Sequence, residues 1–154
     1  MTRYQSKQLR QARISTVGAY YHLRLCCQNR TPYFESPLHA ECAIKSAHWI
    51  DEKNLTQTQC IVLMPDHIHW LVTLKSDNLS NIVTQYKRSI NWKLAYERAS
   101  TGVKWQDGFY HSQIRTEWQL NNVRQYILGN PARAGIAKDF RDYPHCWAPM
   151  LDES

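Results

Sequence analysis

Two neighbouring apolar segments in the middle of the sequence constrain the fold more than any other feature. They cover 58–64 and 67–74, and Pro65-Asp66 between them favours a turn, so together they predict a β-hairpin. Side chains alternate between the two faces of a strand. One face of the second strand therefore carries Ile68, Trp70, Val72 and Leu74. The other face carries His67, His69, Leu71 and Thr73. The first face predicts a core contact, and the second is free to build a site.

Capping residues and apolar periodicity predict the elements around the hairpin. They are a strand from Tyr20, a helix capped by Ser36, a long helix from about Leu79, a strand at the end of 104–115, and a last helix capped by Thr116 and Gln119 that Pro131 bends or ends. The order is strand, helix, hairpin, helix, strand, helix. It predicts an α+β fold, a ferredoxin-like antiparallel sheet with helices on one face and the histidine face open.

Composition adds a partner class and a compartment. The 154 residues suit one domain, 1–154, in which 1–13 form a basic polar arm. A count of 19 Lys+Arg against 13 Asp+Glu, net charge +6, favours an anionic partner such as nucleic acid. No apolar run is long enough to span a membrane, and no signal peptide is recognisable. Five cysteines without a CxxC pair predict reduced thiols in a cytoplasmic protein.

The histidine pair in MPDHIHWL is a candidate metal site. Because His67 and His69 are two residues apart on a strand, both rings project from one face and can reach one divalent ion. The alternative is two ordinary strand histidines with a structural role. Other chemistries with an HxH pair fit poorly, since barrel hydrolases need a longer chain, paired phosphodiesterases need a second copy, and zinc deaminases need a P-C-x-x-C partner.

The last helix presents a second polar group. Asn122, Tyr126 and Asn130 follow at four-residue spacing, so a hydroxyl and an amide stand side by side near the helix end. The alternatives are a half-buried packing role for Tyr126 and a capping role for Asn130. Among nine tyrosines, Tyr86 is the easiest to exclude as a reactive group because it belongs to a core stripe.

Three segments together, MPDHIHWL, WQDGFYHSQI and YILGNPARAGI, resemble the single-tyrosine HUH transposases, and most of all the REP-associated tyrosine transposases. The similarity extends through nearly the whole chain in matching order. The departures are small: Asp66 stands where relatives often have Glu, Ala132 where Val is frequent, and DYPHCWAPM only partly follows the closing segment of the family. That last departure leaves the DNA contacts of the C-terminal segment open.

The resemblance implies a ferredoxin-like domain and a chemistry. His67, His69 and Asn130 would bind Mg²⁺ or Mn²⁺, and Tyr126 would attack single-stranded DNA to give a 5′-phosphotyrosine and a free 3′-OH. The expected partner is single-stranded or hairpin DNA beside short palindromic repeats. The protein is expected as a monomer or a homodimer.

Basic and polar side chains on the open face, the long helix and the arm are the predicted DNA contacts, with Tyr20 as a stacking platform. They are Arg3, Lys7, Arg10, Arg13, His22, Arg24, Lys87, Arg88, His111, Gln113, Arg115 and Arg124. A solvated surface role is the alternative for each single charge. Two alternatives remain for the whole chain: a non-catalytic single-stranded nucleic-acid-binding domain of the same fold, and a domesticated relative that still nicks DNA.

Overall fold

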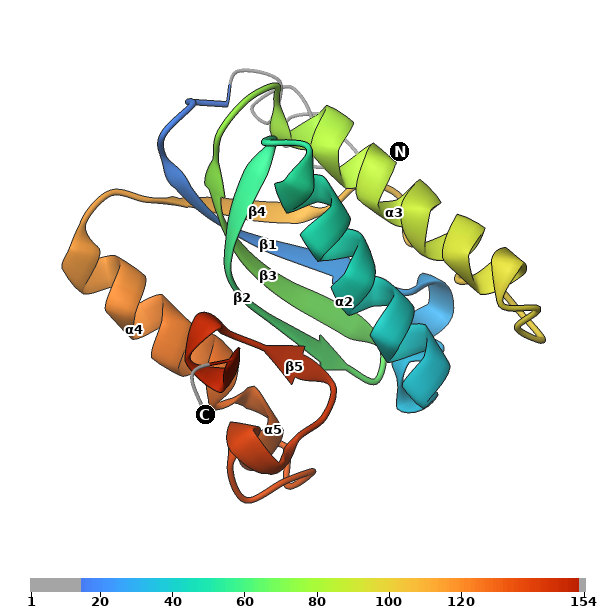
Figure 1. Cartoon of the computed structure of the whole chain (residues 1–154). Helices are drawn as coiled ribbons and strands as arrows, with labels where there is room; N and C mark the ends of the chain where they lie inside the picture. Colours follow the sequence, from blue (N-terminus) through green and yellow to red (C-terminus); the bar gives the residue numbers. More distant parts are fainter. Residues whose placement is uncertain (1–14, 153–154) are drawn as a thin grey trace.

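The computed structural model describes residues 15–152 and contains a five-stranded sheet with helices against it (Figure 1). The strands are β1 (Tyr20–Cys26), β2 (Thr56–Met64), β3 (His67–Leu74), β4 (Tyr110–Ile114) and β5 (Cys146–Trp147). The α-helices are α2 (Pro37–Glu52), α3 (Leu79–Tyr96), α4 (Glu117–Leu128) and α5 (Asn130–Arg133). Short 3₁₀ turns occupy Gln28–Arg30, Tyr33–Glu35, Phe140–Asp142 and Pro149–Asp152.

The strand order is β4-β1-β3-β2-β5, and every neighbouring pair is antiparallel. The first six elements follow the β-α-β-β-α-β order of a ferredoxin-like fold, which confirms the predicted fold class. Local signals acted as expected. Ser36 caps α2 by accepting a hydrogen bond from the His39 backbone N–H, and Thr116 caps α4 by accepting one from Gln119. As predicted, the helix breaks before Pro131, since α4 ends at Leu128.

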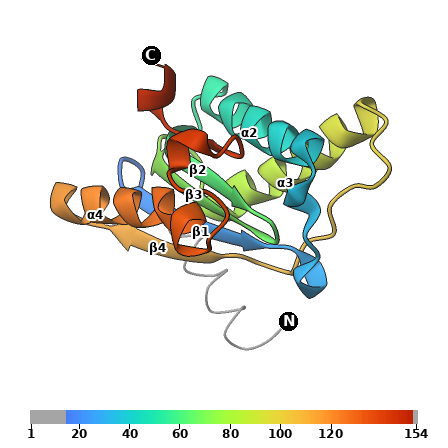
Figure 2. The same cartoon turned by 90° about the horizontal axis from the view of Figure 1, so that it is seen from below.

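The main core lies between the sheet and the helices α2 and α3, which run side by side across one face (Figure 1 and Figure 2). The four apolar side chains predicted for this face of β3 are completely buried. Trp70 stacks on Tyr86 at 4.4 Å between ring centroids and donates its indole hydrogen to the Thr58 hydroxyl at 3.0 Å. The Tyr86 hydroxyl donates to the Ala43 carbonyl at 3.0 Å, so Tyr86 is a core residue, as predicted.

The opposite face is only partly open, which corrects the prediction that helices cover one face alone. Helix α4 packs against β2, where a second cluster of buried residues includes Cys60, Val62, Leu71 and Ile127. The physical reason is that β2 is apolar on both of its faces, so its second face also needs a cover. The part of this face over β1 and β3 carries the two histidines, and we call it the histidine face.

The register of β4 corrects a second prediction. β1 pairs with β4 so that Leu23 lies opposite His111 and Tyr21 opposite Gln113. Cross-strand partners project from the same face, so His111 and Gln113 share the face of the main core and not the histidine face. Tyr110 and Ser112, which pair with Arg24 and His22, occupy the positions on the histidine face instead. A shift of one residue exchanges the two faces of a strand, and sequence does not specify that shift for a short edge strand.

All five cysteines are buried free thiols, as predicted. Burial raises the pKa of the Cys60 thiol to about 12, which leaves it protonated and unreactive at neutral pH. Within residues 15–152, no helix is both long enough and apolar enough to cross a membrane.

The C-terminal segment adds β5, which the sequence did not predict because a two-residue strand has no periodicity. Tyr143 anchors this segment by donating a buried hydrogen bond of 2.6 Å to the Leu63 carbonyl of β2. We expect Tyr143→Phe to lower the free energy of unfolding by about 1 kcal/mol, since one buried hydrogen bond is lost at nearly constant volume. Urea denaturation measures the change. A variant as stable as the wild type would show that water replaces the hydroxyl.

Candidate active site

The two histidines of β3 lie side by side at the centre of the sheet. The ring centroids of His67 and His69 are 4.9 Å apart and the rings are nearly perpendicular. β1 and β2 flank β3 and hold its register on both sides. His69 is 5% exposed, whereas His67 lies nearer the hairpin turn and is partly open. The two rings thus lie on the same face of β3 between two paired strands, and the shared face is what the HxH spacing predicts.

Both rings make their described hydrogen bonds through Nδ1. His67 Nδ1 lies 2.7 Å from Asp66 Oδ1, and the other oxygen of Asp66 accepts a bond of 2.8 Å from Arg30 Nε. His69 Nδ1 lies 2.9 Å from His22 Nε2. The Nε2 atoms of the pair therefore remain for another ligand.

Burial and neighbouring positive charge keep the buried rings neutral. Burial, with smaller contributions from His22 and His67, lowers the pKa of His69 to about 3. Burial and the charge of Arg24 lower the pKa of His22 to about 4. Neutral imidazole is the form that coordinates a metal ion, so protons do not compete for His69 at neutral pH.

Helix α4 brings Tyr126 to this pair. The Tyr126 and His69 ring centroids are 6.4 Å apart, with the rings nearly perpendicular. The tyrosine side chain is half exposed, at 53%. It is therefore both close to the histidines and open to a macromolecular substrate, two features that its helical position alone did not reveal.

Arg133, which was not among the residues predicted from the sequence, links Tyr126 to Asn130. Its guanidinium carbon lies 4.3 Å above the centroid of the Tyr126 ring. The same guanidinium donates to the backbone carbonyl of Tyr126 and, at 3.0 Å, to Asn130 Oδ1. The amide nitrogen of Asn130 is buried and has no hydrogen-bond partner among residues 15–152. Arg133 could have been found from its spacing, because it follows Asn130 by three residues and so shares its helix face.

The predicted DNA contacts do not form one surface. Arg24 is exposed on the histidine face, with its guanidinium 4.4 Å from the centroid of the Tyr110 ring. The His22 ring is turned toward His69. Arg115 is exposed at the end of β4. Arg124 reaches from α4 to Gln59 of β2 at 3.2 Å, beside a groove rather than beside the histidines.

The two basic residues of α3 lie away from the histidine pair, because α3 packs on the opposite face of the sheet. Lys87 is half-buried, and its ammonium donates hydrogen bonds to the carbonyls of Gln106 and Gly108 in the loop before β4. Arg88 lines an open groove with Trp49 and Trp92. The prediction that both belong to the surroundings of the histidine face is wrong. The arm residues Arg3, Lys7, Arg10 and Arg13 lie outside the described residues.

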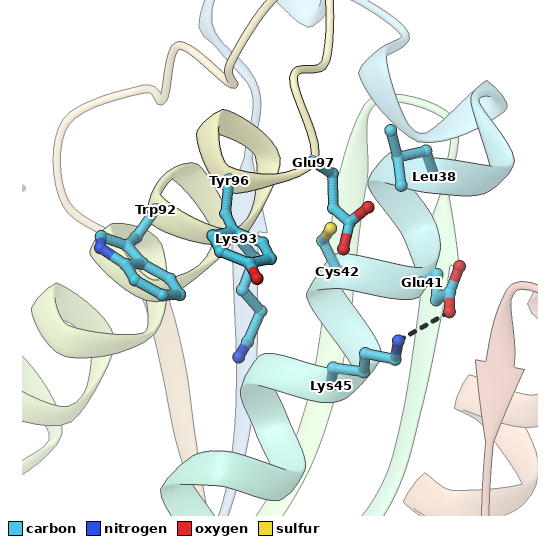
Figure 3. Close-up of a pocket in the computed structure, with 8 residues that line it drawn as sticks. All are labelled: Leu38, Glu41, Cys42, Lys45, Trp92, Lys93, Tyr96 and Glu97. Carbon is cyan, nitrogen blue, oxygen red and sulfur yellow. Dashed lines mark ion pairs between the residues drawn. The ribbon is translucent and has the colours of Figure 1, made fainter.

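Two further observations bear on alternative sites. A cavity of about 290 Å³ lies between α2 and α3, lined among others by Glu41, Cys42 and Tyr96 (Figure 3). Of the predicted site residues that fall within 15–152, none lines this cavity. Within residues 15–152, no group of three or more His, Cys, Asp or Glu side chains is placed to hold a metal ion. The predicted ligand set, two histidines and an amide, is of a different kind.

In this chain a histidine pair on a ferredoxin-like sheet lies beside a helical tyrosine. This arrangement agrees with the class of single-tyrosine transposases that the motifs resemble. The family model "Transposase IS200 like" matches residues 15–130, and the chain belongs to this family. It is therefore an enzyme that cleaves and joins DNA, as predicted.

Individual relatives agree with the family. A REP-associated tyrosine transposase of Haemophilus influenzae is 28% identical over 143 residues, covering 84% of this chain and 80% of the relative. Among solved structures, a REP-associated tyrosine transposase bound to a REP hairpin superposes with a TM-score of 0.66 at 20% identity, covering 85% of this chain and 77% of that one. A transposase structure from Deinococcus radiodurans gives a TM-score of 0.53 at 18% identity, covering 73% and 92%. These structural matches support the fold.

Proposed function

We propose that the protein is a metal-dependent single-stranded DNA endonuclease and strand transferase that acts beside hairpin-forming repeats through Tyr126. The observation that carries the proposal is the contact between elements far apart in the sequence. Tyr126 of α4 lies against His69, and His69 lies against His67, so a hydroxyl nucleophile and two imidazoles share one partly open site.

The donor set fits a divalent cation such as Mg²⁺ or Mn²⁺. His67 and His69 would hold it through Nε2, because their Nδ1 atoms are engaged. Asn130 would add a neutral oxygen, since its Oδ1 accepts one bond from Arg133 and a carbonyl oxygen has two lone pairs. When bound, such a cation supplies charge stabilisation for the phosphate under attack. Nitrogen ligands favour Mn²⁺ over Mg²⁺.

The tyrosine performs the covalent step. The Tyr126 oxygen forms a bond to phosphorus while the bond from phosphorus to the 3′ oxygen breaks, which leaves a 5′-phosphotyrosine and a free 3′-OH. Because the phosphodiester energy is retained in the covalent link, a 3′-OH can later reverse the step and join strands. The Arg133 guanidinium lies over the face of the Tyr126 ring and would add positive charge beside it. Because the Tyr126 side chain is half exposed, its phenol proton would pass to water, and the departing 3′ oxygen would take up a proton from water.

Hairpin DNA is the proposed substrate class. The structural relative at TM-score 0.66 is bound to a REP hairpin, and the chain has a net charge of +6. On the histidine face, Arg24 and Tyr110 offer a cation and an aromatic ring beside the site. The basic arm with Arg3, Lys7, Arg10 and Arg13 is proposed to contact the unpaired flank.

The test is covalent capture. Labelled single-stranded DNA that carries a hairpin and its flank is incubated with the protein and Mn²⁺, and SDS-resistant adducts are counted. An adduct that depends on both metal and protein supports the proposal. Tight binding of the DNA without any adduct would favour the non-catalytic binding domain instead.

A matched pair of arginines tests which face binds DNA. We expect Arg24→Ala to weaken hairpin binding several-fold and to reduce the slope of log Kd against log salt by about 0.7–0.9, the release of one phosphate contact. Arg88→Ala removes another exposed charge, on the opposite face of the sheet, and should leave both quantities unchanged. Fluorescence anisotropy at several salt concentrations measures them. Equal effects of the two variants would contradict the assignment of the histidine face.

A further inference from the structure

Two side chains outside the proposed ligand set hold the rings of the histidine pair. Asp66 comes from the hairpin turn and lies 2.7 Å from His67 Nδ1. His22 comes from β1 and lies 2.9 Å from His69 Nδ1, with the two ring centroids 5.1 Å apart. Both contacts engage the same ring atom, although they come from unrelated parts of the chain. Each ring is therefore oriented by one hydrogen-bond partner at its Nδ1 atom.

The direction of the first hydrogen bond follows from charge. Asp66 forms an ion pair with Arg30 at 2.8 Å, and an ionised carboxylate only accepts hydrogen bonds. His67 Nδ1 must therefore carry the hydrogen, and a neutral His67 then has an unprotonated Nε2. The backbone holds the carboxylate in place, because the Asp66 carbonyl accepts a bond of 2.9 Å from the Cys27 N–H at the end of β1.

The second hydrogen bond has two directions, and only one of them suits a metal. If His22 donated, His69 would carry its hydrogen on Nε2 and could not coordinate a cation there. If His22 accepts, His69 carries its hydrogen on Nδ1 and its Nε2 is free. Metal-binding histidines are commonly oriented by a partner that accepts from their other ring nitrogen.

We propose that His22 and Asp66 are positioning residues that hold His69 and His67 in the Nδ1–H form, with both Nε2 atoms directed to a divalent cation. The proposal rests on the proposed function and deepens it, because it adds two residues that touch neither the cation nor the DNA. It also replaces the DNA contact predicted for His22 with a role inside the site.

The first experiment measures Mn²⁺ binding to the full chain without DNA, by electron paramagnetic resonance. His22→Phe keeps a ring but removes the acceptor, and Asp66→Ala removes the carboxylate. Each should raise the Mn²⁺ dissociation constant about 10- to 100-fold. His22→Gln and Asp66→Asn are the matched variants, because each keeps a carbonyl oxygen in reach of Nδ1, and they should stay within a few-fold of the wild type. His22→Phe or Asp66→Ala with wild-type affinity would overturn the assigned role of that residue.

The second experiment reads the tautomers directly in the metal-free wild type. Long-range ¹H–¹⁵N correlation spectra should show the hydrogen of both His67 and His69 on Nδ1, and in His22→Phe the hydrogen of His69 should move to Nε2. This readout does not depend on activity, and a general loss of packing would not produce it at one ring alone. Hydrogen on Nε2 of wild-type His69 would overturn the proposal.

The outcomes separate the two proposals. A wild type that binds Mn²⁺ and forms the DNA adduct, with His22→Phe behaving identically, contradicts only the positioning role. A wild type that neither binds Mn²⁺ nor forms an adduct contradicts the proposed function and this inference with it.

Discussion

Tyr126→Phe is expected to abolish the SDS-resistant DNA adduct and to lower strand cleavage by at least about 10³-fold, since removal of a covalent nucleophile leaves no route to the intermediate. The substitution deletes one oxygen from a side chain that is half exposed. Its ring still packs beside His69 and under Arg133, so folding and affinity for the hairpin should be unchanged. The variant therefore separates binding from chemistry.

Tyr96→Phe is the matched control for this change. Tyr96 is also an exposed helical tyrosine, at 74%, but it lies on α3, which packs against the opposite face of the sheet. The Tyr96→Phe variant should form as much covalent DNA adduct as the wild type. An adduct formed by Tyr126→Phe, or one lost in Tyr96→Phe, would show that another tyrosine is the nucleophile.

The second large effect is expected from the histidine pair. His67→Ala and His69→Ala should each reduce cleavage by about 10²-fold or more, because each removes a ligand from a site with few protein donors. EDTA should do the same to the wild type, and added Mn²⁺ should restore it. Asn130→Ala should have a smaller effect, since water can replace a neutral oxygen ligand. Gel assays of labelled DNA at saturating Mn²⁺ measure these rates.

His111→Ala is the control for the pair. His111 lies on β4 but on the other face of the sheet, so its loss should leave cleavage intact. Because His69 is buried, a thermal melt of His69→Ala must accompany the assay to show that the variant is folded. Undiminished cleavage by both variants of the pair would contradict the metal site.

The sequence predicted the hairpin and the two faces of the strand that carries His67 and His69 correctly because these signals are local. Alternation over 67–74 requires the two rings to share a face, and every apolar residue of the other face is buried. Caps at Ser36 and Thr116 act within one helical turn, so they too can be recognised without knowledge of the fold. The family resemblance depends on the same ordered motifs.

The errors have a different origin. Which side chains of β4 point to which face depends on its hydrogen-bond register with β1. The two strands begin 90 residues apart, at Tyr20 and Tyr110, and β4 has only five residues, so its sequence pattern is too short to specify the register. Helix α4 covers β2 through contact between two apolar surfaces. The sequence does not specify this contact, because any helix with an apolar face could cover β2 in the same way. Lys87 was predicted to contact DNA because the sequence does not show its hydrogen-bond acceptors, the carbonyls of Gln106 and Gly108, which belong to a separate loop.

The sequence by itself therefore determined the order of elements, the histidine pair on one strand face and the polar face of the last helix, since each depends on spacing within one element. Only the tertiary structure decided that Tyr126 lies against His69, that Arg133 holds Tyr126 and Asn130 together, and that His22 and Asp66 contact the two histidine rings. Distances between side chains of different elements follow from how the sheet and helices pack, and packing depends on the shapes of many residues at once.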